Sequence, residues 1–209
     1  MRYPVIVTAT LAVASMVVGV SVVGCSKKSS TSPSAASSSP TSISPTGSSP
    51  STSAAAQPTD YSLLLIKATD INVPGDTFTA QPPVMNPDGN PGVAGSFVNQ
   101  AGTRNLGVTI LVMSDANAAA GALDGTKANF AKGVADGGNP QPASTGTGGT
   151  MFSGTSTDGS KSITALVFTE GKAIVTMEFD GAPNDPAPPD LVNDLGQKQD
   201  AAIKSAGLS

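Results

Sequence analysis

Apolar side chains in the last third of the chain alternate with polar ones. Val175, Met177 and Phe179 alternate with Thr176 and Glu178, which is the pattern of a strand with one buried face. Four further runs have the length and composition of strands: residues 93–99, 106–113, 151–155 and 162–168. Short glycine-containing turns separate the neighbouring runs. The pattern therefore predicts a hairpin and, later in the chain, a three-stranded meander.

Helical spacing of apolar residues occurs in two segments. The first follows Ser114 and Asp115, either of which can cap a helix, and is expected to end at the turn-forming residues 137–140. The second is expected to begin at Pro189 and to stop at Gly207. The apolar faces are Ala119, Leu123, Phe130 and Val134 in the first helix and Val192, Leu195, Ala202, Ile203 and Ala206 in the second. Both helices therefore have one face to bury against a sheet.

The order of these elements predicts the fold class. Two strands, a helix, three strands and a helix give the order ββαβββα, and helices bury their apolar stripes on a sheet face. Residues 60–209 are expected to form one α+β domain with an antiparallel sheet and helices packed on it. Residues 63–71, at its start, fit either a short helix or a buried strand. The apolar fraction leans on Ala and Val and only 4% of residues are aromatic, which predicts a core of small side chains.

The start of the chain has the pattern of an export signal. Arg2 supplies a positive charge, residues 5–23 are largely apolar, and the sequence Val-Val-Gly directly precedes Cys25. These last residues resemble the bacterial lipobox, which implies that residues 1–24 are a lipoprotein signal peptide. The resemblance also implies cleavage between Gly24 and Cys25 and acyl chains on Cys25. An uncleaved membrane-spanning anchor is the alternative, because about 20 apolar residues can cross a bilayer.

The segment after the lipobox is rich in Ser, Thr, Pro and Ala. Between residues 26 and 59 it has no aromatic residue, and Ile43 is its only large aliphatic one. Such a segment cannot bury enough apolar surface to offset the entropy of ordering. Residues 25–59 are therefore predicted to be a lipidated cysteine followed by a disordered tether with a mean reach of about 30–35 Å. The tether is either a plain spacer or an O-glycosylated stalk.

Charge and composition exclude several classes of function. Residues 60–209 carry eight Lys or Arg against fifteen Asp or Glu, a net charge of −7, which disfavours binding to nucleic acid. The chain has no His, and Cys25 is its only Cys. Nucleophile–histidine catalysis, histidine-containing zinc sites and an intramolecular disulfide are therefore excluded. We expect no cofactor and no bound metal, and a monomeric domain stabilised by packing and hydrogen bonds.

Carboxylates near one loop are the first candidate site. Glu178, Asp180, Asp185 and Asp190 lie within 13 positions of one another, and a pair of them could act as general acid and base or hold a cation. The alternative, which we favour, is that these carboxylates simply lie in a solvated acidic loop. Arg104, the only arginine of the domain, lies near a hairpin turn and is interpreted as a surface residue in preference to an anion clamp.

Two loops faintly resemble ligand-binding motifs. Residues 86–90, Asn-Pro-Asp-Gly-Asn, resemble a calcium loop but lack the closing Glu of the 12-residue pattern, so a structural turn is favoured. Residues 145–150, Thr-Gly-Thr-Gly-Gly-Thr, are rich in glycine like a phosphate loop but have no following Lys, so a flexible loop is favoured.

The chain as a whole resembles a group of bacterial lipoproteins. The lipobox, the Ser/Thr/Pro tether, the run Leu63-Leu64-Leu65 and residues 196–200 together look like small cell-envelope lipoproteins of mycobacteria and other actinobacteria. The element order is similar to their PsbP-like domains and to a mycobacterial kinase sensor domain, which has disulfides that this chain cannot form. The resemblance implies a non-enzymatic binding or scaffold module on the outer face of the cell membrane. A carboxylate-based hydrolase and a carrier of a lipid or other apolar ligand are the alternatives.

Overall fold

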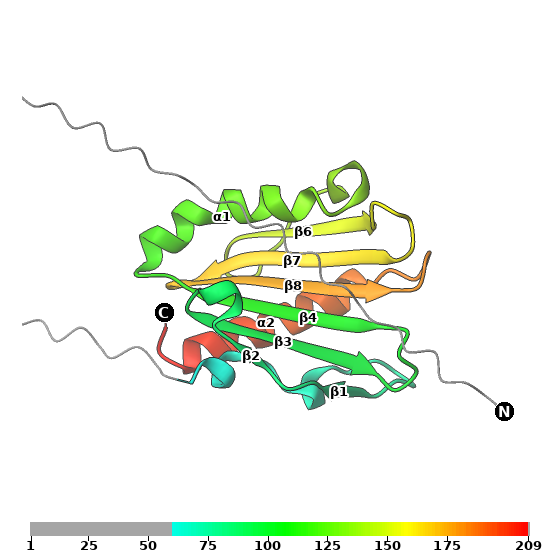
Figure 1. The fold of residues 1–209 in the computed structure, drawn as a ribbon, viewed down its shortest axis with the longest axis horizontal. Helices are drawn as coiled ribbons and strands as arrows, with labels where there is room; N and C mark the ends of the chain where they lie inside the picture. The colour runs from blue at the N-terminus through cyan, green and yellow to red at the C-terminus, as the bar shows by residue number, and fades with distance from the viewer. Residues whose placement is uncertain (1–59, 209) are drawn as a thin grey trace, which may run out of the picture. The chain divides into compact units, whose positions relative to one another are not determined.

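The computed structural model describes residues 60–208 (Figure 1). The predictions for residues 1–24, for cleavage and lipidation at Cys25 and for the tether of residues 25–59 lie outside the described residues. The two clusters of buried apolar residues are formed by side chains between Tyr61 and Leu208, so this segment supplies its own core. Between residues 60 and 208, no helix is long and apolar enough to cross a membrane.

Eight strands form one antiparallel sheet. Their order across the sheet is β1-β3-β4-β8-β7-β6-β5, and the short strand β2 also pairs with β3. The bounds are β1 Phe78–Ala80, β2 Val84–Met85, β3 Gly92–Asn99, β4 Asn105–Val112, β5 Gln141–Pro142, β6 Thr147–Thr155, β7 Ser162–Glu170 and β8 Ala173–Gly181. The predicted hairpin is β3–β4 and the predicted meander is β6–β7–β8. The ladder between β4 and β8 joins them.

Two long helices pack on these strands, and only α1 connects one strand to another. Helix α1 spans Ala116–Ala131, and its N-cap Asp115 accepts a hydrogen bond from the N–H of Ala118 at 2.8 Å. Helix α2 spans Pro189–Ser205. The predicted α+β class, with an antiparallel sheet and packed helices, is therefore confirmed.

The helices lie on opposite faces of the sheet, as strand β7 shows. Leu166 and Phe168 of β7 belong to the main core with α2, whereas Ala165 and Val167 belong to a second cluster with α1. Successive side chains of a strand point to opposite faces, so α2 covers one face and α1 covers part of the other. Figure 1 shows α2 behind the strands and α1 along the β6 side. Strand β7 is consequently buried on both faces.

Residues 63–71, which fitted either a helix or a strand, form two short 3-10 turns. These are η1, Tyr61–Leu64, and η2, Ala68–Asp70. The fully buried side chain of Gln199 in α2 holds the segment between them. Its Oε1 accepts a hydrogen bond from the N–H of Ile66 at 3.2 Å, and its Nε2 donates to the carbonyl of Leu64 at 2.6 Å. The start of the domain is thus fastened to its last helix.

Three details of the sequence-based prediction were wrong. The short strands β1, β2 and β5 were not foreseen. The first helix ends at Ala131, and Val134 is buried beyond it, in a bridge to Ser156. The core is not made of small side chains, because four of the six phenylalanines are buried. These are Phe97, Phe152, Phe168 and Phe179.

Candidate functional site

An apolar pocket of about 340 Å³ lies at the end of the sheet where β4 begins and β8 ends. Its walls come from three separate segments: the chain leading into β1, the start of β4, and the loop between β8 and α2. The apolar lining residues are Ile71, Val73, Pro74, Phe78, Leu106, Phe179, Pro186, Ala187, Pro188 and Leu191. Ile71, Leu106 and Phe179 also belong to the main core. The pocket is therefore an opening into the end of that core.

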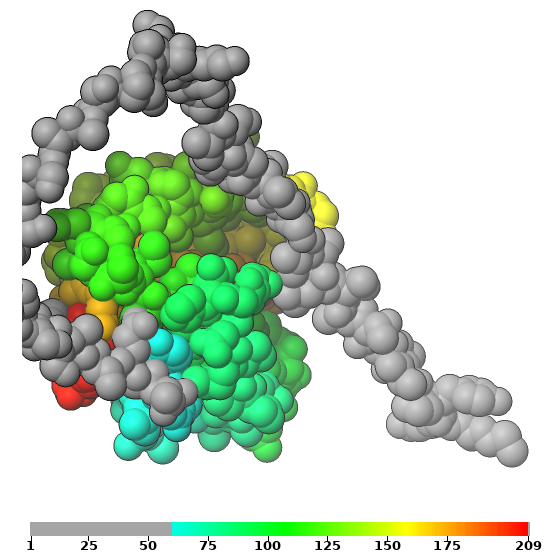
Figure 2. All heavy atoms as spheres, turned by 60° about the vertical axis from the view of Figure 1, so that its left-hand side comes forward, coloured from blue at the N-terminus to red at the C-terminus, as the bar shows by residue number. Residues whose placement is uncertain are grey.

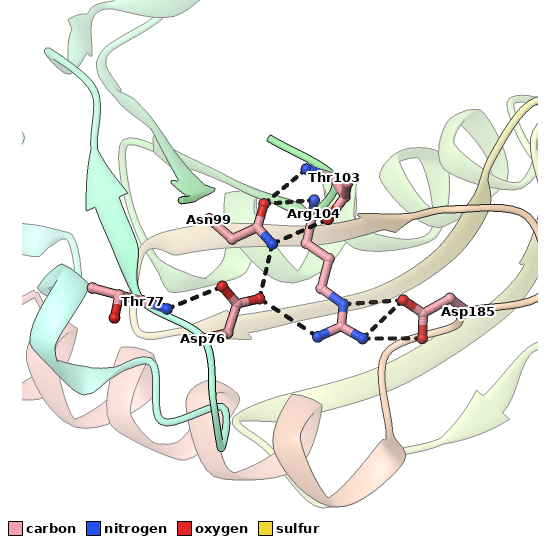
Figure 3. A network of polar contacts seen from close by, with 6 residues as sticks. All are labelled: Asp76, Thr77, Asn99, Thr103, Arg104 and Asp185. Atoms are coloured by element: carbon pink, nitrogen blue, oxygen red, sulfur yellow. Dashed lines mark hydrogen bonds and ion pairs between the residues drawn. The ribbon is translucent and has the colours of Figure 1, made fainter. Parts of the chain in front are cut away.

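Arg104 joins two of these walls across the pocket (Figure 3). Its Nε donates to Asp185 Oδ2 at 3.1 Å, and its Nη2 donates to Oδ1 at 3.1 Å and to Oδ2 at 2.8 Å. Its Nη1 lies 3.5 Å from Asp76 Oδ2. A guanidinium that donates from two nitrogens to one carboxylate is held in a defined orientation. One arginine thus connects the β3–β4 turn to the loop before α2 and to the segment before β1.

Asn99 holds the other side of this network. Its buried side chain donates from Nδ2 to Asp76 Oδ2 at 2.8 Å, and its Oδ1 accepts from the N–H groups of Thr103 and Arg104 at 2.8 and 2.9 Å. The main chain of Arg104 is fixed by the residue that also orients its ion-pair partner Asp76. We call Asp76, Asn99, Arg104 and Asp185 the Arg104 network (Figure 3).

A second ionic cluster lies nearby on the face of the sheet opposite α2. Lys161 Nζ lies 2.7 Å from Asp180 Oδ2 and 3.6 Å from Glu178 Oε1. Partial burial and then the negative charge of Asp180 raise the pKa of Glu178 above its ordinary value of 4.5, against the opposing effect of Lys161. Asp180 also lines the pocket. We call Lys161, Glu178 and Asp180 the Lys161 cluster.

The four carboxylates singled out from the sequence do not converge on one point. Glu178 and Asp180 share Lys161, whereas Asp185 is bound to Arg104. Asp190 lies exposed in the first turn of α2. Within residues 60–208, no group of three or more Asp, Glu, His or Cys side chains is arranged to hold a metal ion. Their closeness in sequence therefore does not produce one acidic site.

Arg104 was interpreted as a surface residue, but its part in an ion-pair network was not predicted. Its side chain is 39% exposed, but it is the centre of the ion-pair network beside the pocket. Its partner Asp185 lies 81 positions away in the chain, so local pattern could not reveal the pair. The apolar lining was missed for the same reason. The one available signal was that the domain has a single arginine.

The two loops that resemble ligand-binding motifs have structural explanations. Asn86 and Asp88 take the left-handed conformation, with φ of 51° and 52°, in an exposed turn around η3, Pro87–Gly89. Figure 2 shows the left-hand end of Figure 1, with this turn at the surface in blue-green. Such a conformation is tolerated best by Asn, Asp and Gly, so the composition of the loop follows from its shape.

The glycines of residues 145–150 allow close packing. A Cβ at Gly146 would overlap Phe168, one at Gly148 would overlap Leu123, and one at Gly149 would overlap main-chain oxygens. Residues 147–150 are the start of β6, with a register irregularity between Thr147 and Thr150, so the prediction of a flexible loop there was wrong. Glycine is thus required here by the neighbouring core side chains and main chain, which leaves no need for a phosphate to explain it.

Comparison with known proteins gives no relative for this chain. No protein-family model matches the sequence, and no significant match is found among curated proteins or solved structures. The arguments for function below therefore rest on the residues of this chain.

Proposed function

We propose that this chain is an exported lipoprotein, anchored to the outer face of the cell membrane through acyl chains on Cys25. The proposal is supported by the apolar segment that ends in Val-Val-Gly before Cys25 and by the Ser/Thr/Pro-rich residues that follow it. Two acyl chains suffice for stable anchoring, since each buried methylene contributes about 0.8 kcal/mol. The segment of residues 26–59 would then place the folded domain away from the lipid surface, in the cell envelope.

The anchor is tested by labelling growing cells with a fatty-acid probe. Cys25→Ala should remove the label and leave the protein uncleaved or released. A matched variant, Ser26→Ala, changes the next residue and should keep both label and cleavage. Label retained on the Cys25→Ala protein would contradict the lipoprotein assignment.

The folded domain is proposed to be a binding module for a small apolar ligand. The observation that carries this proposal is the pocket of about 340 Å³, whose lining is mainly apolar and which opens into the core. Ligand pockets usually have volumes of about 300–1,000 Å³ and an apolar lining with a few placed polar groups. Here the Arg104 network supplies those polar groups. A binding role needs no histidine or cysteine in the domain, which has neither.

Binding is tested with the neutral fluorescent probe N-phenyl-1-naphthylamine and a chain that begins at residue 26. We expect saturable binding to the wild-type sequence. Ala187→Trp places an indole ring in the pocket wall and should abolish that binding. Ala201→Trp places the same ring on an exposed position of α2 and should leave it unchanged. Equal binding by all three proteins would show that the pocket is not the binding site.

A carboxylate-based hydrolase is the second candidate, because the pKa of Glu178 is raised. General acids are often carboxyl groups whose pKa has been raised by their surroundings. In this candidate Glu178 would donate the proton and Asp180 would be the second carboxylate of the pair. Hydrolysis of model esters or glycosides that is lost in Glu178→Gln and kept in Glu170→Gln would favour it over the binding module.

A further inference from the structure

One cation, Arg104, lines the pocket, and a second, Lys161, lies outside the lining beside Asp180; each of them is shared by two carboxylates. Arg104 lies between Asp76 and Asp185, and Lys161 lies between Glu178 and Asp180. Arg104, Asp180 and Asp185 line the pocket directly. The described part of the domain also has an excess of acidic residues over basic ones. An ion near this pocket therefore meets more negative than positive charge.

We propose that the pocket binds an apolar ligand whose polar end is positively charged, such as an alkyl amine. This proposal rests on the binding role proposed above and specifies the chemical class of the ligand. The apolar part would occupy the space over Leu106, Phe179 and Leu191, and the ammonium would lie at the acidic rim. A positive charge gains from the surrounding carboxylates without breaking any existing ion pair.

An anionic ligand would meet an arginine that is already paired with two carboxylates. The Nε and Nη2 groups of Arg104 already donate to Asp185, and its Nη1 faces Asp76. Lys161 donates to Asp180 at 2.7 Å. A carboxylate ligand would have to displace one of these pairs and then lie beside the displaced carboxylate. Like charges at such distances repel, so an anion is disfavoured relative to an uncharged molecule of the same shape.

Three ligands with the same alkyl chain test the proposal on the chain that begins at residue 26. Octylammonium, 1-octanol and octanoate are titrated by displacement of N-phenyl-1-naphthylamine at neutral pH and low salt. Octylammonium should bind tightest, and octanoate should bind about tenfold or more weakly than octylammonium. Raising the salt concentration should narrow this difference, because ions screen the partly exposed rim charges.

Two variants with the same change in net charge locate the effect. Asp185→Asn removes the main partner of Arg104, so octanoate should gain affinity and octylammonium should lose it. Asp194→Asn removes a similarly exposed carboxylate from α2 that pairs with Lys198 outside the pocket, and should leave the order unchanged. If the probe binds but octanoate equals or exceeds octylammonium, the cationic ligand class is wrong and the binding role stands. If neither the probe nor any octyl compound binds, both proposals are wrong.

Discussion

The two faces of the sheet are covered to very different extents. On the α2 face, the main cluster contains twenty buried residues. They come from the segment around the first two 3-10 turns, from the four strands β3, β4, β7 and β8, and from α2 and Leu208. On the α1 face, the cluster contains four: Leu123, Phe152, Ala165 and Val167. Beyond α1, that face carries partly exposed polar side chains at the β4–β8 ladder, including Thr109, Thr176 and Glu178. The α2 face therefore carries most of the apolar burial, and the α1 face leaves the sheet only partly covered at β4 and β8.

Removal of a phenylalanine from each face gives the largest expected difference. Phe168 on the α2 face is fully buried, and Phe152 on the α1 face is 3% exposed beside Phe130. Phe168→Ala should lower the free energy of unfolding by about 4–5 kcal/mol, and Phe152→Ala by about 3 kcal/mol. Denaturant unfolding of both variants measures the two losses. A larger loss for Phe152→Ala would contradict the unequal roles of the faces.

The contact between α2 and the start of the domain adds polar stability to the same face. Gln199→Ala leaves the N–H of Ile66 and the carbonyl of Leu64 without partners in a buried site. We expect a loss of about 2–3 kcal/mol in the free energy of unfolding. Gln197→Ala, at an exposed position of the same helix, should change it by less than about 0.5 kcal/mol. Similar losses in the two variants would mean that the buried amide contributes nothing specific.

In helix capping the advantage is reversed, because the less buried helix α1 has the side-chain cap. Asp115 caps α1, whereas α2 begins after Pro188 without a side-chain cap. Helix α1 buries only Ala119 and Leu123, so its stability depends more on local interactions. Asp115→Ala should lower the free energy of unfolding by about 1 kcal/mol. Asp115→Asn keeps a capping oxygen and should recover most of that loss, as measured by thermal unfolding.

A change in pH is expected to have the smallest effect on stability. It tests Glu178, which lies on the partly exposed region of the α1 face. Glu178 has a pKa above its ordinary 4.5 in the folded protein, so the folded state binds this proton more tightly than the unfolded chain. The stabilisation that protonated Glu178 contributes to the folded state is therefore fully present below pH 4.5, and it is lost as the pH rises through the pKa of Glu178 in the folded protein. Glu178→Gln removes this ionisation, so the difference in melting temperature between pH 4 and pH 7 should shrink. Glu170→Gln serves as the control. If this variant reduced the difference in melting temperature by the same amount, the effect would come from the change in net charge and not from Glu178.

The long elements of the fold could be predicted from the sequence, and the short ones could not. The alternation in residues 173–179 and the helical spacing after Pro189 gave β8 and α2, because each repeats over several turns or residue pairs. Strands β1, β2 and β5 have only two or three residues, too few for a periodic signal. They pair because longer neighbours already present an edge.

The candidate site depended on long-range contacts that no local pattern contains. Asp185 was noted as one of four acidic residues, but its partner Arg104 lies in the β3–β4 turn, 81 positions away in the chain. The pocket lining combines residues near positions 73, 105 and 187. Each of these short segments is unremarkable alone, so only the folded arrangement brings them together.

The position of β8 between β4 and β7 has a consequence for folding. The β3–β4 hairpin and the β6–β7–β8 meander each involve neighbours in the chain, whereas the β4–β8 ladder joins Asn105 with Asp180 and Val112 with Ala173. Closing such a long loop costs more entropy than forming a tight turn. During synthesis, the inner edge of β4 also stays without its partner until β8 has emerged. The central ladder is therefore completed late, and a chain that stopped after β7 would leave two long strand edges open to pairing with other molecules.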